Sequence, residues 1–534
     1  MVKLVTAAQM KVAEDAANAA GLTYDTMMEN AGRAVAQAIE EQFGATGRHI
    51  TLLIGPGNNG GDGLVAARYL SDLGASVSLY IWKRRNLETD PNWQRLESYV
   101  LPAVHRADDP QGQKLADLLE RSAIVVDALL GTGVSRPIEG DLADLLRTAR
   151  TVIDRRRTLR PPLLVDPIDP SPAEEIGPAV VAVDLPSGLH TDTGVLDPLT
   201  LPADLTVTFA APKRGQVLFP GAAYVGQLLI ADIGIRLEYL PEDLPQLATT
   251  DFVAGLLPAR PLHGHKGTFG RAMIAAGCPN YCGAPALAAT AAYRVGAGLV
   301  TLAVSPPVQG LVAPKLTEAT YHLLPHREGA IAAPAAGALV EGLGGYSALL
   351  VGPGLGQAET TAQFLDDLLP QLPDIPLALD ADALNLLSKQ SRWWTRLPPE
   401  TIITPHPGEM SRLSGVPVRE IEADRLDFVP ERARQWGTVI VYKGAFTVVA
   451  APDGETVVMP FANPALATAG SGDVLAGAIA GMLAQRLPPF EAAVAGAYLH
   501  GLAGELARER FGEAGVVAGD LLPLLPLAIR ELAG

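Results

Sequence analysis

Apolar residues along the chain follow two different periods, and the change between them marks the predicted elements. From residue 6 to about residue 42 they recur at helical spacing, with a break at 21–23, which predicts two helices. From residue 49 onward, continuous apolar runs alternate with amphipathic segments. This alternation is typical of a mostly parallel sheet with helices on both faces. The predicted strands of this first series are 49–55, 76–82, 122–127, 179–184, 204–209 and 223–235.

A proline-rich, acidic segment separates this series from a second one. Residues 239–250 read YLPEDLPQLATT, which predicts a linker between a first domain at 1–238 and a second α/β domain at 251–534. Residues 155–178 are predicted to be a surface insertion, because so long a loop is unusual inside a compact domain. The second series comprises predicted strands at 271–277, 298–305, 347–354, 376–384, 401–409 and 438–445, followed by alanine-rich helices from 472 to the end.

The composition of the chain limits its size class and the ligands that it can bind. The chain has 534 residues, too many for one ordinary domain, and 48% of them are hydrophobic, so substantial cores can form. Lysine and arginine number 41 against 58 acidic residues, which gives a formal charge of −17. Proteins that bind duplex nucleic acid usually carry a basic surface, so nucleic-acid binding is disfavoured. Small anions remain possible ligands, because backbone N–H groups can hold them.

The cysteines and the hydropathy indicate the compartment. Cys278 and Cys282 cannot form a disulfide framework for so long a chain, and no histidine cluster beside them suggests a zinc site. They are predicted to be reduced packing residues. No apolar signal core precedes Glu14, and no run of about 18 apolar residues occurs. A cytoplasmic protein that does not span a membrane is expected.

The first candidate site is the glycine-rich turn at 55–63, between a predicted strand and a predicted helix. Its glycines allow the backbone to approach a ligand, and the helix start offers unpaired N–H groups. The spacing formally satisfies a dinucleotide-binding fingerprint, but Lys83, Arg84 and Arg85 stand where an NAD site has an acid to hold the ribose. Asp62 within the turn would repel a bare phosphate. An ordinary tight turn is the alternative.

Two further predicted strands end in a carboxylate. Asp127 precedes the turn 130–137, and Asp184 precedes 185–188. Because the carboxyl ends of parallel strands gather at one crevice, asparagine, aspartate and serine oxygens from these turns could together hold a hard cation. With two carboxylates, a large monovalent ion fits as well as a divalent one. Capping of the following helices by these aspartates is the alternative.

The second domain carries a glycine turn that opens a strongly helical stretch, with Asp473 in its first turn. Gly470 and Gly472 free backbone N–H groups for an anion at the positive end of the helix. Such groups can stabilise a transferring phosphoryl group, while a carboxylate takes the proton from the attacking hydroxyl. A glycine-rich helix cap without catalytic function is the alternative.

Three other turns follow predicted strands of the second domain. Lys443–Thr447 offers lysine and threonine to a nucleotide, although such a segment is more often a hairpin turn. Residues 352–356 form a glycine-rich turn. His406 lies between two prolines, which fix its presentation at a strand end.

These motifs, in this order, resemble the family of bifunctional NAD(P)H-hydrate repair enzymes, in which an epimerase domain is fused to a dehydratase domain. The first domain carries TAAQM (6–10), MMENAG (27–32), NNGGDGL (58–64), DALLGTG (127–133) and VDLPSG (183–188). The second carries HKGTFG (265–270), GAGLV (296–300), GPGLG (352–356), DADALN (380–385), TPHPGE (404–409), KGAFT (443–447) and GSGDVLAG (470–477). The chain departs from the family at the insertion and at Ala469, where relatives often have a further glycine.

The resemblance implies a Rossmann-like, three-layer epimerase domain and a ribokinase-like α/β dehydratase domain. The epimerase would interconvert the R and S hydrates of NADH or NADPH at C6 of the nicotinamide ring. The dehydratase would remove water from the S hydrate with ADP and Mg²⁺, giving AMP and phosphate. The resemblance also suggests a homo-oligomer.

Site residues follow from the same resemblance. In the epimerase, the hydrated cofactor would contact Asn58, Asn59, Gly60, Gly61, Asp62, Gly131, Thr132, Gly133, Val134, Ser135, Arg136, Pro137 and Asp184. K⁺ would bind Asn59, Asp127 and Ser187. In the dehydratase, the hydrate would face Gly356, His406 and Asp473, and the adenine nucleotide would contact Lys443, Gly444, Ala445, Phe446, Thr447 and Gly472.

The catalytic groups are predicted to be Asp184, as the epimerase acid or base, and Asp473, as the base that activates the C6 hydroxyl. The alternative enzyme is a ribokinase-like vitamin or sugar kinase fused to a nucleotide-binding domain. For the first domain alone, a non-enzymatic binding module is a further alternative.

Overall fold

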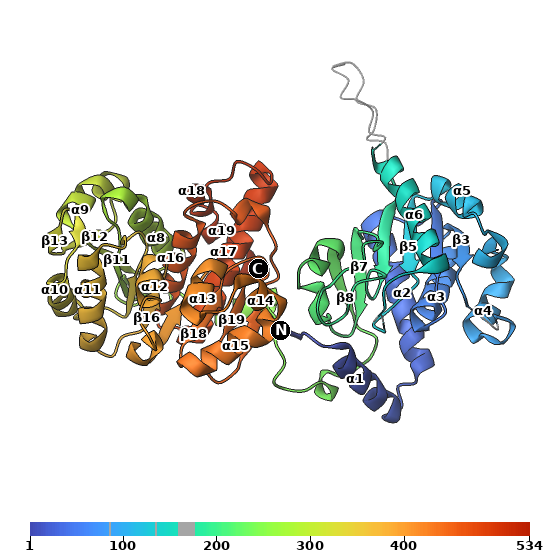
Figure 1. Ribbon diagram of the computed structural model, residues 1–534, viewed down its shortest axis with the longest axis horizontal. Coiled ribbons are helices and arrows are strands. Elements are labelled where there is room, and N and C mark those ends of the chain that lie inside the picture. The colour runs from blue at the N-terminus through green and yellow to red at the C-terminus, as the bar shows by residue number, and fades with distance from the viewer. Residues whose placement is uncertain (85–86, 134–135, 159–176, 534) are drawn as a thin grey trace, which may run out of the picture. The chain divides into compact units, whose positions relative to one another are not determined.

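The computed structural model describes residues 1–84, 87–133, 136–158 and 177–533. The chain divides into two compact units, Lys3–Leu244 and Pro245–Gly534, the second of which also includes Met1–Val2 (Figure 1). Across the described ranges, no helix has both the length and the apolar character needed to cross a membrane. Val134, Ser135 and residues 159–176 of the predicted insertion fall outside these ranges.

The N-terminal unit is built on a parallel sheet. Within its described residues the strand order is β4-β3-β2-β5-β6-β7-β8, and every neighbouring pair is parallel. The strands are β2 (His49–Ile54), β3 (Ser76–Ile81), β4 (Ala103–His105), β5 (Ile124–Ala128), β6 (Ala179–Val183), β7 (Leu205–Phe209) and β8 (Gln227–Ala231). The helices are α1 (Ala7–Ala19), α2 (Tyr24–Phe43), α3 (Asn58–Asp72), α4 (Pro91–Leu96), α5 (Gln113–Arg121) and α6 (Gly140–Thr158).

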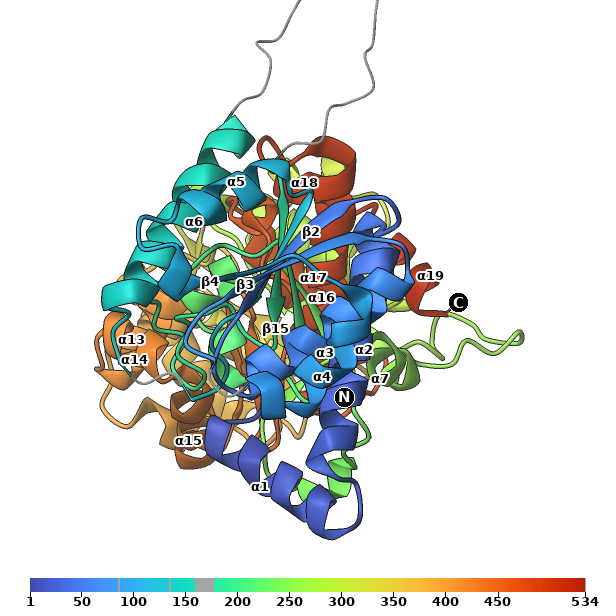
Figure 2. The ribbon, with the colours of Figure 1, turned by 90° about the vertical axis from the view of Figure 1, so that its right-hand side faces the viewer.

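Alternate residues of these strands pack into two separate cores. Leu52 of β2 and Val126 of β5 join the core formed with α1, α2 and α3, whereas Leu53 and Val125 join the core formed with α5 and α6. Figure 2 shows β2, β3 and β4 between these two groups of helices. Both faces of the sheet are therefore covered, which explains the uninterrupted apolar runs of the sequence.

The strand order places a binding crevice between β2 and β5. These strands are neighbours, but the chain continues from β2 towards β4 on one side and from β5 towards β8 on the other. At such a switch point, the loops after the two strands diverge and leave a crevice at their carboxyl ends. The turns after β2, β5 and β6, which carry the predicted epimerase residues, all open at this edge.

The C-terminal unit contains a larger, mixed sheet. Over its described part the order is β1-β9-β20-β19-β18-β17-β16-β15-β10-β11-β12, with parallel pairing from β18 to β12 and antiparallel pairing of β18, β19 and β20. The strands are β1 (Val2–Lys3), β9 (Gln246–Leu247), β10 (Arg271–Ala275), β11 (Leu299–Val304), β12 (Thr320–Leu323), β15 (Ala348–Val351), β16 (Leu377–Leu379), β17 (Thr401–Ile403), β18 (Val439–Tyr442), β19 (Val448–Ala450) and β20 (Thr456–Val458). A separate hairpin pairs β13 (His326–Arg327) with β14 (Ala330–Ile331).

Helices cover this sheet as well. Those packed in its main core are α7 (Thr250–Leu256), α8 (Gly283–Arg294), α9 (Pro306–Val312), α16 (Ser471–Ala484), α17 (Pro489–Phe511), α18 (Ala518–Leu521) and α19 (Leu525–Ala533). The remaining helices are α10 (Ala335–Gly342), α11 (Glu359–Leu368), α12 (Asp382–Leu387), α13 (Pro407–Ser414), α14 (Val418–Ala423) and α15 (Arg425–Trp436). Small residues let α16 approach its neighbours closely, since a Cβ on Gly477 would lie 2.1 Å from the carbonyl oxygen of Ala288 in α8.

The structure adds detail to the predicted linker and corrects the start of the predicted insertion. Within residues 239–250, Leu240 and Leu244 are buried in the N-terminal core and Gln246–Leu247 form β9 of the C-terminal sheet, so the two units divide between Leu244 and Pro245. These apolar side chains anchor the segment at both ends, which its prolines and acids concealed. The predicted insertion 155–178 also begins too early, because α6 continues to Thr158.

Candidate active sites

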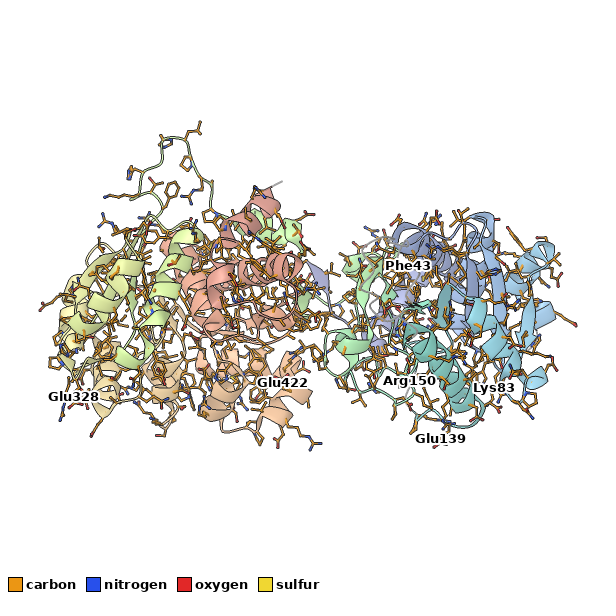
Figure 3. All side chains as sticks on the ribbon, turned by 90° about the horizontal axis from the view of Figure 1, so that it is seen from above. Phe43, Lys83, Glu139, Arg150, Glu328 and Glu422 are labelled. Carbon is orange, nitrogen blue, oxygen red and sulfur yellow. The ribbon has the colours of Figure 1, made fainter. Side chains whose placement is uncertain are left out.

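A pocket of about 720 Å³ opens at the carboxyl ends of β2, β5, β6 and β7. Of the predicted epimerase residues, the structure places Asn58, Asn59, Asp62, Gly131, Thr132, Gly133, Arg136, Pro137 and Asp184 in its lining. The other lining residues are Glu14, Pro56, Gly57, Trp82, Leu129, Leu130, Ile138, Glu139, Leu142 and Phe209. Figure 3 shows Glu139 at the outer margin of the unit. The predicted turns after β2, β5 and β6 therefore line the same pocket.

Gly60 and Gly61 lie beneath this pocket and do not line it. A Cβ on Gly60 would lie 2.1 Å from the carbonyl oxygen of Gly55, and one on Gly61 would lie 2.7 Å from Sδ of Met28. Glycine at these positions therefore lets the first turn of α3 pack against its own approach loop and against α2.

Asp127 is hydrogen-bonded to Ser187, and Asn59 and Ser187 both contact the backbone of Leu130. The Asp127 carboxylate accepts hydrogen bonds from the Ser187 N–H (2.8 Å) and Oγ (2.6 Å). The Asn59 amide donates to the carbonyl oxygens of Leu130 and Val183, both at 2.9 Å. Burial raises the pKa of Asp127, and the hydrogen bonds from Ser187 and Leu129 oppose that rise. Among the described residues, no cationic side chain contributes to this balance.

The Asp184 carboxylate is held by a buried lysine that the sequence analysis missed. Asp184 Oδ1 accepts hydrogen bonds from Lys213 Nζ, from Thr208 Oγ1 at 3.0 Å and from the Phe209 N–H at 3.3 Å. Lys213 Nζ also donates to Thr208 Oγ1 at 2.9 Å, and only 1% of its side chain is exposed. Lys213 follows the end of β7, so the strand-end rule that selected Asp127 and Asp184 could have found it.

Two other carboxyl groups face the same pocket. Burial, followed by the charges of Asp184 and Glu14, raises the pKa of Asp62 well above its ordinary value. Burial also raises the pKa of Glu14, which α1 brings to the pocket and which the sequence analysis did not select. The pocket is therefore a place where burial and neighbouring negative charge favour the protonated form of Asp62 and Glu14.

Arg84 explains why the strand after the glycine turn ends in basic residues. Its Nη1 donates to the carbonyl oxygens of Gly55 (3.2 Å) and Gly57 (2.9 Å). Its guanidinium also pairs with Asp90 at 2.6 Å. Arg84 thus stabilises the glycine turn by bonding its carbonyl oxygens. It stands where an NAD site has the acid that binds the ribose, and here that position stabilises the turn.

In the C-terminal unit, the turn before α16 places an aspartate at a helix N-terminus. Gly470 caps the helix with a φ of 89°, a conformation that glycine adopts readily. Asp473 follows in the first turn. Burial, then the charge of Asp380, raises the pKa of Asp473 to about 7, and Lys443 opposes this rise. A carboxyl group poised in this way can take a proton at neutral pH.

Lys443 connects the acidic groups of this site. Its Nζ donates to Asp380 Oδ1 at 2.7 Å and lies 3.7 Å from Glu409 Oε2. A Cβ on Gly472 would lie 3.5 Å from the same Nζ. Burial lowers the pKa of Lys443, but Asp380, Glu409 and Asp473 together hold it above its ordinary value. The predicted residues Lys443, Gly472 and Asp473 therefore share one cluster.

His406 lies at the start of α13, in a reciprocal cap with Glu409. Its Nδ1 accepts the N–H groups of Gly408 (3.0 Å) and Glu409 (3.3 Å), and Glu409 Oε2 accepts the His406 N–H (2.9 Å). Burial, then the charges of Lys443 and Arg412, lowers the pKa of His406. Burial raises the pKa of Glu409 to about 7. Asp380 and Glu409 had no predicted function, although both lie in motifs at strand ends.

Gly356 borders a second pocket, of about 660 Å³, in the C-terminal unit. Its N–H donates to Asp382 Oδ2 at 2.9 Å, and the charge of Asp382 also raises the pKa of Asp473. The pocket is further lined by Cys278, by Tyr281 and by the β13–β14 hairpin, whose Glu328 is labelled in Figure 3. Gly356 is thus linked through one carboxylate to the cluster around Asp473.

The segment Lys443–Thr447 is a hairpin turn, as the more common interpretation of its sequence had it. It joins β18 to the antiparallel strand β19. Thr447 Oγ1 donates to the Gly444 carbonyl oxygen at 2.8 Å, and Arg425 donates to the Ala445 carbonyl oxygen at 2.9 Å. These bonds fix the shape of the turn, which begins with Lys443, the lysine that contacts Asp380 and Glu409.

These features define a two-domain α/β enzyme, with an acidic crevice in a parallel three-layer unit and, in a second unit, an aspartate in the first turn of a glycine-capped helix. A family profile described as YjeF-related protein N-terminus matches residues 24–215, and one described as NAD(P)H-hydrate dehydratase matches residues 272–526. The bifunctional NAD(P)H-hydrate repair enzyme Nnr of Moorella thermoacetica is 40% identical, over 99% of this chain and 97% of the relative. The enzyme of the same name from Escherichia coli is 33% identical, over 96% of this chain and 90% of the relative.

The chain belongs to the family of bifunctional NAD(P)H-hydrate repair enzymes. It combines an epimerase of hydrated NADH and NADPH with a nucleotide-driven dehydratase of the S hydrate, on a Rossmann-like and a ribokinase-like unit. The ADP/ATP-dependent NAD(P)H-hydrate dehydratase from Bacillus subtilis, co-crystallized with ATP/Mg²⁺, is 36% identical, with a TM-score of 0.47, over 54% of this chain and 99% of that one. The predicted family, fold class and activity are confirmed.

Proposed function

We propose that Asp473 is the general base of the dehydratase and that the start of α16 receives the transferring phosphoryl group. The observation that carries this proposal is the meeting of Asp473, Lys443 and the amide-rich turn 470–472 at one helix N-terminus. The hydrate would enter beside Gly356 and His406, and the adenine nucleotide beside Lys443–Thr447 and Gly472. Replacing Asp473 with asparagine and following both dehydration and ADP binding tests this assignment.

The reaction converts a poor leaving group into a good one. Asp473 takes the proton of the C6 hydroxyl, and the oxygen attacks the β-phosphorus of ADP, so that AMP leaves. The amides at 470–472 and Lys443 stabilise the negative charge of the transferring group. The lone pair of the ring nitrogen then expels phosphate from C6, and loss of a proton from C5 restores the dihydropyridine.

Mg²⁺ would enter this site with the nucleotide. In the described part of the chain, no group of three histidine, cysteine or acidic side chains is placed to hold a metal ion by itself. Mg²⁺ is commonly bound through one or two carboxylates together with substrate phosphates, and Asp380 and Glu409 are the carboxylates nearest to Lys443. The metal would supply charge neutralisation of the phosphates.

In the epimerase, we propose that Asn59, Asp127 and Ser187 bind K⁺. A buried carboxylate without a cationic partner is costly even when it accepts hydrogen bonds, and Asp127 is only 1% exposed, so a cation held by these neutral and acidic oxygens would offset its charge. The ion would organise the loops after β5 and β6.

K⁺ dependence can be measured directly. Replacing K⁺ by tetramethylammonium is expected to slow epimerisation about tenfold, the effect of losing ~1.4 kcal/mol. The Asp127→Asn variant should be slow in both buffers, because it lacks the carboxylate that favours the ion. Equal wild-type rates in the two buffers would contradict the site.

Asp184 is proposed as an acid/base group at C6 of the hydrate, since it lines the pocket and its other oxygen is fixed by Lys213. With Asp184→Asn, a mixture of hydrates supplied with ADP should lose its S form normally while the R form persists. Loss of a general acid or base costs roughly 10²–10⁴-fold. Chromatography of the two hydrates follows both pools, and depletion of the R form faster than its spontaneous rate would disprove the role.

A cytoplasmic location fits the two free cysteines, which persist in a reducing compartment. We also infer a homo-oligomer from the family resemblance, and light scattering of the purified protein would test it.

A further inference from the structure

The epimerase pocket contains two carboxyl groups whose surroundings differ sharply. Asp184 Oδ1 accepts three hydrogen bonds, from Lys213, Thr208 and Phe209. An ammonium group and two other hydrogen-bond donors stabilise negative charge on the oxygen that they contact, so these contacts favour the carboxylate. The Asp62 carboxyl group, by contrast, has no hydrogen-bond partner within the described part of the chain.

The charged groups around the pocket also favour an ionised Asp184 and a protonated Asp62. Glu14, Asp62 and Asp184 face it, while the cations that act on Asp62 are Arg84 and Lys213. Arg84 is already paired with Asp90 at 2.6 Å, and Lys213 donates to Asp184. The pKa of Asp62 is raised by burial and then by Asp184 and Glu14. Asp62 is therefore the group best able to retain a proton next to an ionised Asp184.

We propose that Asp62 is the proton donor that works with Asp184 in epimerisation, and that Lys213 is a positioning residue that orients Asp184. Both carboxyl groups line the one pocket, and each is 8% exposed, so both can reach a bound hydrate. The proposal rests on the epimerase assignment made above and adds a second catalytic residue to it.

The chemistry of the hydrate requires such a pair. C6 carries both a hydroxyl group and the ring nitrogen N1, so the ring can open as a cyclic hemiaminal does. Asp184 takes the hydroxyl proton, the C6–O bond becomes a carbonyl, and the C6–N1 bond breaks with its electron pair moving to N1. Asp62 gives its proton to N1. The product is an open-chain aldehyde, in which C6 is no longer a stereocentre.

Ring closure reverses these transfers. Rotation about the C5–C6 bond presents the other face of the aldehyde to N1. N1 attacks C6, Asp62 takes back the N1 proton, and Asp184 returns its proton to the oxygen. Both carboxyl groups regain their first protonation states, and no external proton or co-reactant is consumed. The cycle needs one carboxyl group protonated and the other ionised at its start.

The test follows conversion of purified S hydrate into R hydrate by the full chain without nucleotide, so that the dehydratase has no phosphoryl donor. Asp62→Asn should slow this conversion roughly 10²–10⁴-fold. Asp72→Asn is the matched control, because Asp72 lies exposed at the other end of α3. It should convert at the wild-type rate. An Asp62→Asn rate within threefold of wild type would overturn the proposal.

The pH profile separates a proton donor from a residue that only shapes the pocket. Wild-type conversion should fall as pH rises through the pKa of Asp62, because the donor loses its proton. The residual activity of Asp62→Asn should lack this fall. If Asp62→Asn does not fold, Asp62→Glu replaces it, and its fall should lie at a different pH from that of the wild type. A fall retained in Asp62→Asn, or unmoved in Asp62→Glu, would overturn the proposal.

The same assay distinguishes failure of this inference from failure of the proposed epimerase. If the wild-type chain converts the S hydrate no faster than buffer alone, the epimerase assignment itself is wrong. If the wild-type chain is active and Asp62→Asn is equally active, only the role of Asp62 is wrong.

Discussion

Replacing Asp473 with asparagine is expected to abolish nucleotide-driven dehydration while leaving ADP binding largely intact. The amide keeps the shape of the first turn of α16 but cannot take the proton of the C6 hydroxyl. Removing a general base commonly costs roughly 10²–10⁴-fold in rate. Recovery of the near-ultraviolet absorbance of the reduced nicotinamide measures turnover, and calorimetric titration with ADP measures binding. Turnover close to that of the wild type would refute the role of Asp473.

The pH dependence of the dehydration rate provides an independent test of the role of Asp473. Because the carboxylate is the active form and its pKa is about 7, the wild-type rate should rise as pH increases through about 7 and then level off. Asp473→Asn should lack this rise. The control Asp374→Asn makes the same chemical change at an exposed position and should behave as the wild type. An unchanged rise in Asp473→Asn would assign it to another group, of which Glu409 is the foremost candidate.

Replacing Lys443 with methionine is expected to destabilise the C-terminal unit and to inactivate the dehydratase. The substitution removes the cation that bonds Asp380 and approaches Glu409, and these two side chains are only 2% and 3% exposed. Breaking a buried ion pair from one side costs ~3–5 kcal/mol, because a buried charge is left uncompensated. Urea unfolding followed by fluorescence of the packed Trp393–Trp436 cluster measures this loss.

A second substitution tests the reason for that loss. In Lys443→Met combined with Asp380→Asn, the uncompensated carboxylate is gone, so part of the lost free energy of unfolding should return. If the double variant is as unstable as the sum of the two single variants, the pair is not coupled. The epimerase rate serves as a control for the fold of the other unit.

The sequence predicted the elements of both units well, because long apolar runs covered on both faces leave few alternatives. The predicted helices at the start of the chain and the strands from 49 onward correspond to α1, α2 and the parallel sheet. The anchoring of residues 239–250 could not be predicted, because Leu240 and Leu244 contribute to a core that only tertiary packing reveals. Short apolar anchors among prolines and acids carry no periodic pattern.

The candidate sites were predicted in part, for a related reason. Asp127, Asp184 and Asp473 could be selected because each ends a strand or starts a helix. Lys213 is brought to Asp184 by the fold across 29 residues, and Arg84 turns back onto the glycine loop that precedes it. Such partners depend on side-chain direction and burial. A single sequence offers no pattern for either.

The cap at the start of α13 has a consequence for how His406 can meet a ligand. Because its Nδ1 receives two backbone N–H groups, the single proton of the neutral imidazole must reside on Nε2. One tautomer is thereby selected before any substrate arrives. The ring can offer a hydrogen to a carboxamide or phosphate oxygen, but it has no free lone pair with which to accept one.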